Sequence, residues 1–289
     1  MRRIRHALLL GEGHTRRILI AALIVAAVPL AAPTSAGASK SAGWIVGCGF
    51  SHRSSDDPIV MPGMTGMSHS HDFFGNETTD GGSTVSSLLG KPTTCSLAAD
   101  TSAYWAPTLY KNGAAVQPIK AAIYYRTQVD GGPVQPFPLG LMLIAGDSHA
   151  TAPQSILIVY YNCHDGPEQH HAPLPYDCGT HLIDAHIVFP QCWDGVNLDS
   201  PDHKSHVVYP TRSHGTRTCP ASNPVILPRL IIRISWPITN GDGVQLASGS
   251  PYTLHADFLN AWDPPTQQKL VDTCINAGID CGKQVDPKA

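Results

Sequence analysis

The sequence contains none of the short motifs that mark several common enzyme classes. It has no G-x-S-x-G, no phosphate-binding Walker loop, no dinucleotide fingerprint and no H-E-x-x-H. These absences argue against serine hydrolases of that type, nucleotide enzymes and common zinc proteases. The pattern C-x-x-C is missing too. A zinc ribbon or a thioredoxin-like redox site is therefore not expected.

Long apolar runs are also missing, apart from one near the N-terminus. Five arginines precede an apolar run over residues 18–32, and Ala36-Gly37-Ala38 has the small-x-small form of a cleavage site. This pattern predicts a secretory signal peptide over residues 1–38 and a secreted, extracellular protein. A membrane anchor is the alternative, but the run contains Pro29 and is shorter than the roughly 20 residues that a spanning helix needs.

Basic residues are few in the remaining chain, residues 39–289, which we expect to form a single secreted β-rich domain. The whole chain has 19 Lys+Arg and 22 Asp+Glu. Without the five arginines and one glutamate of the leader, 14 basic and 21 acidic residues remain, which gives a formal charge of −7. An acidic chain with no basic cluster argues against nucleic acid or anionic membrane as a partner. No stable membrane insertion is expected after signal cleavage.

All eight cysteines follow the predicted leader. An even number of cysteines in an oxidising compartment predicts four disulfides. Spacing alone does not fix their pairing, but the two shortest separations favour Cys163–Cys178 and Cys274–Cys281.

Glycine and proline are frequent and evenly spread, so long helices are not expected. Short apolar or alternating runs recur between turn signals, and their β-branched and aromatic content predicts strands. Short helices are expected near residues 102–110 and 266–277. The fold class is therefore all-β with few short helices, a disulfide-stapled β-sandwich or jelly roll with long loops. The expected strands are 121–126, 139–145, 155–161, 185–189, 206–209, 230–236 and 252–255.

Three clusters of polar side chains carry possible chemistry. Two of them place histidine or aspartate two residues apart, so that both side chains share one face of a strand. The third lies in the Asp- and His-rich segment 189–210, which predicts an ordered surface loop carrying groups that bind or react. Imidazole and carboxylate ligands suit a divalent transition metal such as zinc or copper, or manganese or iron. The clusters are His69 with His71, Asp202 with His203 and His206, and His255 with Asp257.

Two kinds of role remain open for these side chains. We expect His69, His71 and His203 to bind a metal, and His206, His255, Asp257 and Asp202 to be catalytic, as acid, base, ligand or orienting group. The same residues could equally be solvated or structural, since H-x-H alone is weak evidence. A glycosidase ordinarily needs two opposed carboxylates, and Asp202 with Asp257 is the one pair that we nominate.

Aromatic residues offer a second kind of site. Trp193, Trp262 and Tyr125 lie beside polar, Gly or Pro residues, and exposed rings can stack on sugar faces. Arg126 follows Tyr125 and could contact an acidic or hydroxylated ligand. We expect these four residues to line a ligand site, with the alternative that the rings pack in the core.

Five blocks in order resemble the domain-of-unknown-function family DUF1996, a secreted family of fungi and actinobacteria. The likeness covers about residues 43–263 and implies that the three polar clusters belong to the family's recurrent motifs. Fungal members often carry WSC modules, which are implicated in binding wall polysaccharide, and this chain has none. The resemblance implies no reaction. The blocks are DPIVMPG…SHSHDFFG, YWAPTLY, PFPLGLMLIAGD, FPQCWDGVNLDSPDHKSHVVYP and HADFLNAWD.

The leading hypothesis is a His/Asp pocket that acts on extracellular or cell-wall polysaccharide, by hydrolysis or by elimination. The alternative is a non-catalytic protein that binds wall glycan or a transition metal such as copper.

Overall fold

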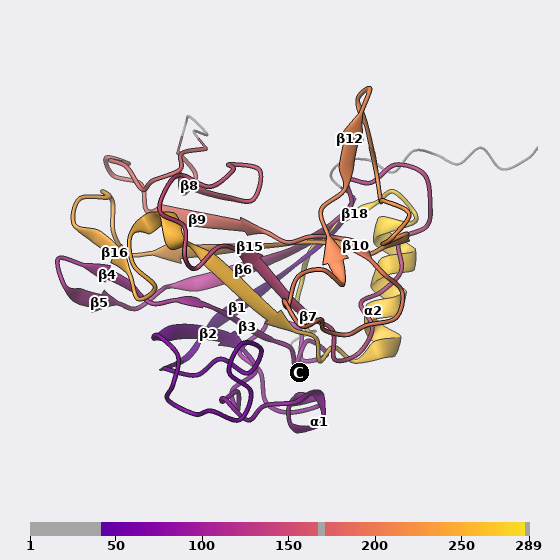
Figure 1. Cartoon of the computed structure of the whole chain (residues 1–289), viewed down its shortest axis with the longest axis horizontal. Coiled ribbons are helices and arrows are strands. Elements are labelled where there is room, and N and C mark those ends of the chain that lie inside the picture. The colour runs from indigo at the N-terminus through magenta and orange to yellow at the C-terminus, as the bar shows by residue number, and fades with distance from the viewer. Residues whose placement is uncertain (1–41, 167–170, 287–289) are drawn as a thin grey trace, which may run out of the picture. The chain divides into compact units, whose positions relative to one another are not determined.

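One long strand, β1 (Gly43–Ser54), connects the two halves of a 10-stranded sheet (Figure 1). The computed structural model describes residues 42–166 and 171–286, so the predicted signal peptide lies outside the described residues. The N-terminal part of β1 pairs with β6, and its C-terminal part pairs with β2 after an irregularity between Phe50 and Arg53. A bulge of this kind bends a strand, which lets β1 belong to both halves.

The first half runs in the order β18, β1, β6, β15, β9, β8, and all its pairs are antiparallel except β1 with β18. The second half runs from β1 through β2, β3 and β17 to β7. The sheet nearly closes because β7 and β9 contact each other. The bounds are β2 His71–Gly75, β3 Ala103–Pro107, β6 Lys120–Arg126, β7 Met142–Gly146, β8 Val159–Cys163, β9 Ile183–Val188, β15 Arg229–Trp236, β17 His255–Leu259 and β18 Asp280–Gln284.

Smaller sheets and short helices surround this body. β10 (Cys192–Trp193) pairs with β11 (Val207–Val208) and β14 (Val225–Ile226), and β12 (Thr211–Ser213) pairs with β13 (Thr216–Thr218). A third small sheet contains β4 (Leu109–Lys111), β5 (Ala114–Val116) and β16 (Val244–Leu246). The helices are α1 (Val85–Leu88), α2 (Pro264–Leu270), a 3-10 turn over Pro251–Thr253 and a π-helical turn over Val271–Ile275.

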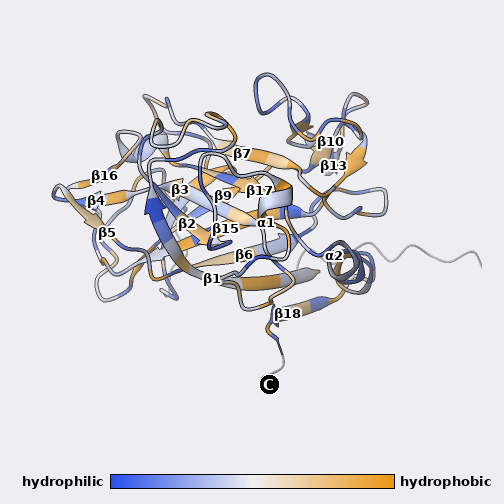
Figure 2. Ribbon diagram, turned by 90° about the horizontal axis from the view of Figure 1, so that it is seen from below, coloured by the Kyte–Doolittle hydropathy of each residue, from blue (hydrophilic) through white to orange (hydrophobic). Residues whose placement is uncertain are grey.

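The main core lies between the inner faces of the two halves. Trp44 of β1 stacks on Tyr125 of β6, and both are fully buried. Tyr104 of β3 stacks on Phe258 of β17 in the same cluster. The strands through the middle of the molecule are coloured mostly as hydrophobic in Figure 2. Burial of these large side chains supplies the main driving force for the fold.

A second, smaller core lies on the outer face of the second half. Phe73 of β2 and Trp105 of β3 stack there. They pack with Leu88 of α1 and with Ile59, which lies in the connection from β1 to β2. The connection therefore lies over the ends of β2 and β17, and this placement creates the site described below.

The all-β prediction is confirmed, and the sandwich-like arrangement agrees with it. Four disulfides join Cys48–Cys95, Cys163–Cys178, Cys192–Cys219 and Cys274–Cys281, which confirms both pairs favoured by spacing. No helix among the described residues is long and apolar enough to cross a membrane.

The prediction of a helix near residues 102–110 is wrong, because β3 and β4 occupy that segment. Its aromatic residues pack on both faces of a sheet, with Tyr104 in the main core and Trp105 in the smaller one. Such burial favours a strand. The helix expected over 266–277 is present as α2 and the π-helical turn.

Candidate metal centre

Three polar side chains lie in the otherwise apolar outer face of the second half-sheet. His71 begins β2, and His255 and Asp257 occupy alternate positions at the start of β17. His71 pairs with Pro107 and Asp257 with Trp105, so β3 lies between them and its Pro107 end brings His71 level with His255. Alternation along each strand therefore directs all three side chains to the same face.

The connection from β1 to β2 adds two more side chains, Asp57 and His69. The ligand atoms of His69, His71 and His255 lie within 4.8 Å of one another, and so do those of Asp57, His71 and Asp257. His69 Nε2 lies 3.3 Å from His255 Nε2. We call these five residues the His/Asp centre. Residues as far apart in the sequence as Asp57 and Asp257 thus meet in two groups that share His71.

Two backbone carbonyls fix the orientation of the buried imidazoles. His71 Nδ1 lies 2.9 Å from Asp56 O, and His255 Nδ1 lies 2.8 Å from Thr253 O. Because a carbonyl only accepts hydrogen bonds, each Nδ1 carries the proton and each Nε2 keeps a lone pair. The Nε2 atom of His71 is buried and has no hydrogen-bond partner. Metal-bound histidines are typically held in this way.

Asp257 is the most unusual member of the centre. Its side chain is only 1% exposed, and neither carboxylate oxygen has a hydrogen-bond partner in the part of the chain that the structure describes. Burial, with a smaller contribution from Asp57, raises the pKa of Asp257 well above its ordinary value. Asp57 is buried as well, but its Oδ1 accepts hydrogen bonds from the backbone N–H groups of Ile59 and Val60. An unpaired buried carboxylate is costly, so the site favours an added cation or proton.

Burial also keeps the three imidazoles neutral. It lowers the pKa of His255 to about 4 and the pKa of His71 well below its ordinary value. The less buried His69 has a lowered pKa for the same reason. Metal binding needs the deprotonated imidazole, which these residues provide at neutral pH.

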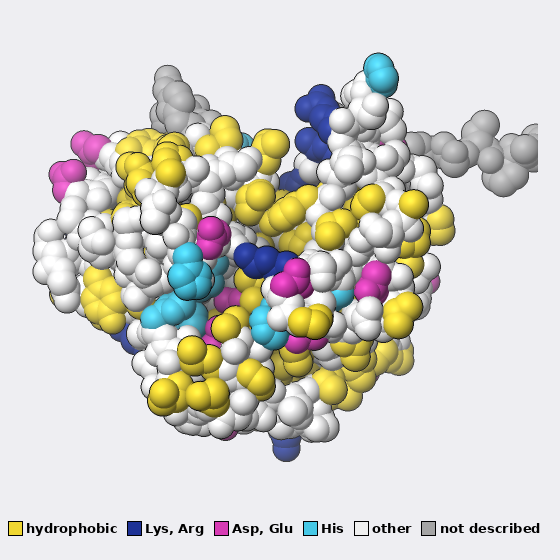
Figure 3. All heavy atoms as spheres, in the orientation of Figure 1, with side chains coloured by type: hydrophobic (Ala, Val, Ile, Leu, Met, Phe, Trp, Pro, Cys, Tyr) yellow, Lys and Arg dark blue, Asp and Glu magenta, His cyan; other side chains and the backbone are white. Residues whose placement is uncertain are grey.

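Asp57, His69, His255 and Asp257 of the centre line an open cleft of 470 Å³, and His71 does not reach its wall. Histidine and acidic side chains gather around a basic side chain near the middle of the face in Figure 3. Lys204, Asp147 and His149 line this cleft. Lys204 Nζ donates a hydrogen bond to Gly146 O, which holds its side chain across the cleft.

Gly146 allows β7 to approach the centre. It pairs with His255 and has a φ of +86°, and a Cβ there would lie 2.5 Å from Leu254 O. Only glycine fits this approach without strain.

The family model described as "Domain of unknown function (DUF1996)" matches residues 57–262 and includes all five residues of the His/Asp centre. This chain belongs to the DUF1996 family. No curated protein and no solved structure matches it.

The second predicted cluster of this DUF1996 domain divides between two environments. Asp202 and His203 line the cleft. His203 Nδ1 contacts the Asp199 carboxylate at 2.9 Å, and its ring is not among the described groups that could share a metal. Asp202 Oδ1 accepts hydrogen bonds from Lys204 N and Ser205 N, and these bonds lower the pKa of Asp202. Asp202 thus organises the loop at the rim.

His206 does not join the other histidines. It is buried, with Nδ1 2.9 Å from Ser200 Oγ and Nε2 2.7 Å from Met142 O. Both ring nitrogens are therefore occupied: Nδ1 within the loop and Nε2 in attaching the loop to β7. The catalytic role expected for His206 has no support in this placement, and we leave it out of the centre.

The four residues expected to line a ligand site lie elsewhere. Tyr125 and Trp262 are fully buried in the main core, where Trp262 Nε1 donates a hydrogen bond to Tyr125 Oη. Their rings fill the core instead of facing a ligand. Trp193 lines a separate hollow beside Pro264, and Arg126 forms an ion pair with Asp280.

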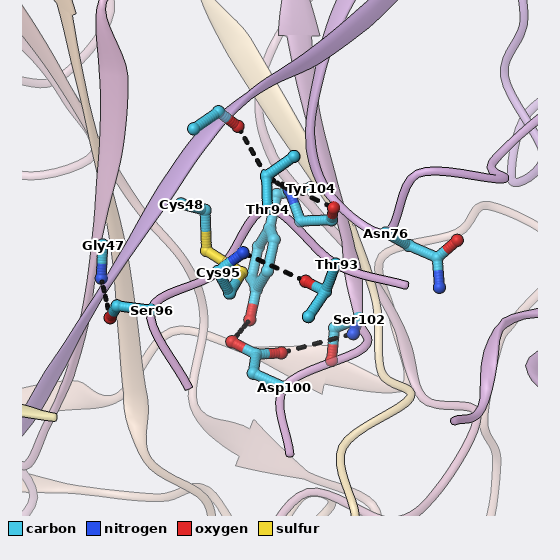
Figure 4. The surroundings of a disulfide bond; sticks show 12 residues. Gly47, Cys48, Asn76, Thr93, Thr94, Cys95, Ser96, Asp100, Ser102 and Tyr104 are labelled. Carbon is cyan, nitrogen blue, oxygen red and sulfur yellow. Dashed lines mark hydrogen bonds between the residues drawn. A yellow bond between two sulfur atoms is a disulfide. The ribbon is translucent and has the colours of Figure 1, made fainter. Parts of the chain in front are cut away.

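A third possible ligand group, Cys48 with Cys95 and Asp100, does not form a metal site. The two cysteines form a disulfide, and Asp100 accepts a hydrogen bond from Tyr104 (Figure 4). A disulfide sulfur is not the thiolate that binds metals.

Four further residues at the cleft were not predicted as site residues from the sequence: Asp57, Lys204, Asp147 and His149. Asp57 opens the first block that resembles the family, which was the one available signal for it. The other three lie in loops whose approach to the centre depends on tertiary structure.

Proposed function

We propose that the His/Asp centre binds a divalent transition metal ion and presents it to a ligand in the cleft. The observation that carries the proposal is Asp257, a buried carboxylate without a hydrogen-bond partner among the described residues, whose ligand atom lies within 4.8 Å of those of Asp57 and His71. His71 in turn lies within the same distance of His69 and His255. A cation would compensate the buried charge, and the histidines supply the remaining ligands.

The donor set fits such an ion in charge, chemistry and spacing. Two carboxylates balance a charge of +2, and three neutral imidazoles with carboxylate oxygens suit zinc, copper, iron or manganese. Two ligand atoms on a tetrahedral zinc ion lie roughly 3.3 Å apart, from bonds of about 2.0–2.1 Å. The His69 and His255 Nε2 atoms have this separation.

A metal of this class, when bound, polarises a ligand oxygen or lowers the pKa of a bound water. His69, His71 and His255 would hold the ion through ring nitrogens, and Asp257 would contribute a carboxylate oxygen through the group that it forms with His71 and Asp57. Asp56 O and Thr253 O hold two of the rings in the required tautomer. Lys204 and His149, on the cleft wall, would contact whatever approaches from outside.

Metal analysis tests this proposal. The purified protein is stripped with a chelator, reloaded with zinc and analysed for bound metal, together with His255→Ala and Asp257→Asn. We expect one tightly bound ion in the unaltered protein and its loss in both variants. His214→Ala is the matched control, because His214 is exposed on the β12–β13 turn. Equal zinc content in all four proteins, or no tight site in the unaltered protein, would contradict the proposal.

We further propose that the centre acts on an extracellular polysaccharide. The cleft above it is open and borders a second hollow, with which it shares Ile144 and Lys204, so that binding sites for successive sugar units can lie side by side. Four disulfides are typical of proteins from oxidising compartments, which supports an extracellular location. Incubation with a glycan panel, followed by analysis for new reducing ends or unsaturated products, tests for a reaction. Binding without products would favour a non-catalytic glycan-binding protein.

A further inference from the structure

The cleft over the His/Asp centre is one end of a longer groove. It shares Lys204 and Ile144 with an adjoining hollow of 320 Å³. That hollow shares Tyr209 and Ile158 with a third of 230 Å³, which shares Arg217 with a fourth of 160 Å³. Each hollow therefore borders the next, and the series leads from the centre to the β12–β13 hairpin. We call this series of hollows the groove.

The far end of this groove is basic. Arg217 on β13 and Arg229 on β15 line the third hollow, and Arg212 on β12 lines the fourth. Figure 3 shows basic side chains beside an apolar hollow near this hairpin. The groove thus combines a cationic end with the proposed metal site at the other end.

These arginines have no acidic partner for their guanidinium groups. The ion pairs found among residues 42–166 and 171–286 do not include Arg212, Arg217 or Arg229. The nearby Asp130 accepts a hydrogen bond from the backbone N–H of Arg217 instead. Arg229 Nε is buried without a hydrogen-bond partner, and burial lowers the pKa of Arg229 to about 10. A half-buried arginine without a counter-charge favours an anion from outside.

A buried amide adds a second unsatisfied group in the same hollow. Gln191 is 1% exposed and lines the hollow beside Arg229, and its Oε1 has no hydrogen-bond partner. An amide oxygen accepts hydrogen bonds from hydroxyl groups, which sugars supply in number. Arginine side chains bind carboxylates, so Arg229 with Gln191 matches a sugar that carries both a carboxylate and hydroxyl groups.

The middle of the groove is mostly apolar and has little aromatic surface. Its walls include Ile144, Ile158, Pro190, Val207 and Val208. Single-stranded nucleic acids bind mainly by stacking on aromatic rings in basic grooves. Tyr209 is the one aromatic ring in this hollow, and the whole chain has a formal net charge of −3. These features favour a polysaccharide over a nucleic acid.

We propose that this groove binds an elongated polysaccharide that carries carboxylate groups. Arg217 and Arg229 bind the carboxylates, Gln191 accepts hydrogen bonds from sugar hydroxyls, and the chain extends along the apolar walls to the His/Asp centre. The inference deepens the proposed function, because it names the substrate class of the same site. Binding at the arginine end needs no metal, so the two proposals can fail separately.

Binding measurements with matched ligands test the inference. The purified, chelator-stripped protein is titrated with a hexamer of galacturonate and with the same hexamer as its methyl ester, which keeps the sugar and removes the charge. We expect binding of the acid form, weakened by added salt, and at least tenfold weaker binding of the ester. Equal binding of both forms, or preferential binding of DNA or of a polyphosphate, would overturn the inference.

Variants then locate the site. Arg217→Ala and Arg229→Gln should each weaken binding of the acid hexamer at least tenfold. Lys120→Ala is the matched control, since it removes one positive charge from an exposed position outside the groove. Zinc content serves as the second readout and should not change in either arginine variant. Arg217 lies on an exposed hairpin, so its variant keeps the fold even if Arg229→Gln does not. Binding within twofold of the unaltered protein in Arg217→Ala would contradict the proposed location.

Discussion

Two fully buried aspartates occupy opposite faces of the same half-sheet, and their surroundings differ completely. Asp100, beside the Cys48–Cys95 disulfide, accepts hydrogen bonds from Tyr104 Oη at 2.8 Å and from Ser102 N at 3.2 Å (Figure 4). Asp257 accepts none among the described residues. Burial alone therefore does not distinguish a structural carboxylate from a functional one.

A series of hydrogen bonds between buried side chains ends at Asp100. Trp262 donates to Tyr125, which in turn contacts Tyr104, and Tyr104 donates to Asp100. Every polar atom in this series has a partner inside the protein. In the His/Asp centre, by contrast, both carboxylate oxygens of Asp257 and Nε2 of His71 are buried and have no partner among the described residues. The comparison indicates that a set of unsatisfied acceptors in a cleft marks a cation site, whereas a satisfied network stabilises the core.

The largest expected effect is on metal affinity. Asp257→Asn should weaken zinc binding more than a hundredfold, because it removes the charge that compensates the ion and loss of even an indirect contact costs 10–100-fold. Asp100→Asn, an identical change at the other buried aspartate, should leave affinity unchanged. Competition titration against a zinc indicator measures both. A similar loss in the two variants would remove the distinction between the aspartates.

Metal should also stabilise the fold. A ligand present at 100 times its Kd raises the free energy of unfolding by about 2.7 kcal/mol. For a domain of this size the midpoint of thermal unfolding should rise by roughly 5–10 °C. Calorimetry with and without zinc checks this, and Asp257→Asn should lose the increase. An unchanged midpoint in the unaltered protein would mean that no site binds the ion preferentially in the folded state.

Asp100 should make stability depend on pH. Burial raises its pKa to about 7 from 3.8, so between these values the folded state binds more protons than the unfolded state. Stability from this group is therefore full below pH 3.8 and falls as pH rises towards 7. The groups facing it are Tyr104 and Tyr125, which stay neutral over this range. From pH 5 to pH 7 the loss should be about 2 kcal/mol.

Urea unfolding of the unaltered protein and of Asp100→Asn at both pH values measures this contribution. The difference in slope between the two proteins isolates Asp100 from other titrating groups. Identical slopes would show that Asp100 has an ordinary pKa.

The smallest expected effect concerns His206. Because one of its ring nitrogens contacts Ser200 in the same loop and the other contacts Met142 O of β7, His206→Ala should reduce the free energy of unfolding by about 1–2 kcal/mol. Its zinc affinity should stay that of the unaltered protein. Chemical denaturation together with zinc titration tests this pair of outcomes. Loss of zinc binding with unchanged stability would contradict this interpretation and would assign His206 to the metal site.

Much of the centre could be predicted from the sequence because strand geometry is local. His255 and Asp257 are two residues apart on β17, and the side-chain period of a strand places them on one face. His71 lies on β2, whereas His69 precedes the strand, yet the two rings still lie 4.2 Å apart. The disulfides over short separations could be expected for the same local reason.

The remainder depends on long-range packing, which residue spacing does not record. Asp57 reaches the centre only because its loop covers the outer face of the sheet. In the sequence, His206 and Trp262 have neighbours as polar as those of His69. In the fold, both side chains are buried and form hydrogen bonds that stabilise the structure. The distinction between Asp100 and Asp257 likewise depends on which donors the fold brings to each carboxylate.

The most direct test is an X-ray absorption spectrum of the zinc-loaded protein. We expect a shell of nitrogen and oxygen neighbours at about 2.0–2.1 Å from the zinc. We also expect outer-shell scattering from three imidazoles, and this signal should decrease in His255→Ala. A shell of water oxygens alone, or a spectrum that stays the same in His255→Ala, would contradict a metal centre built from these residues.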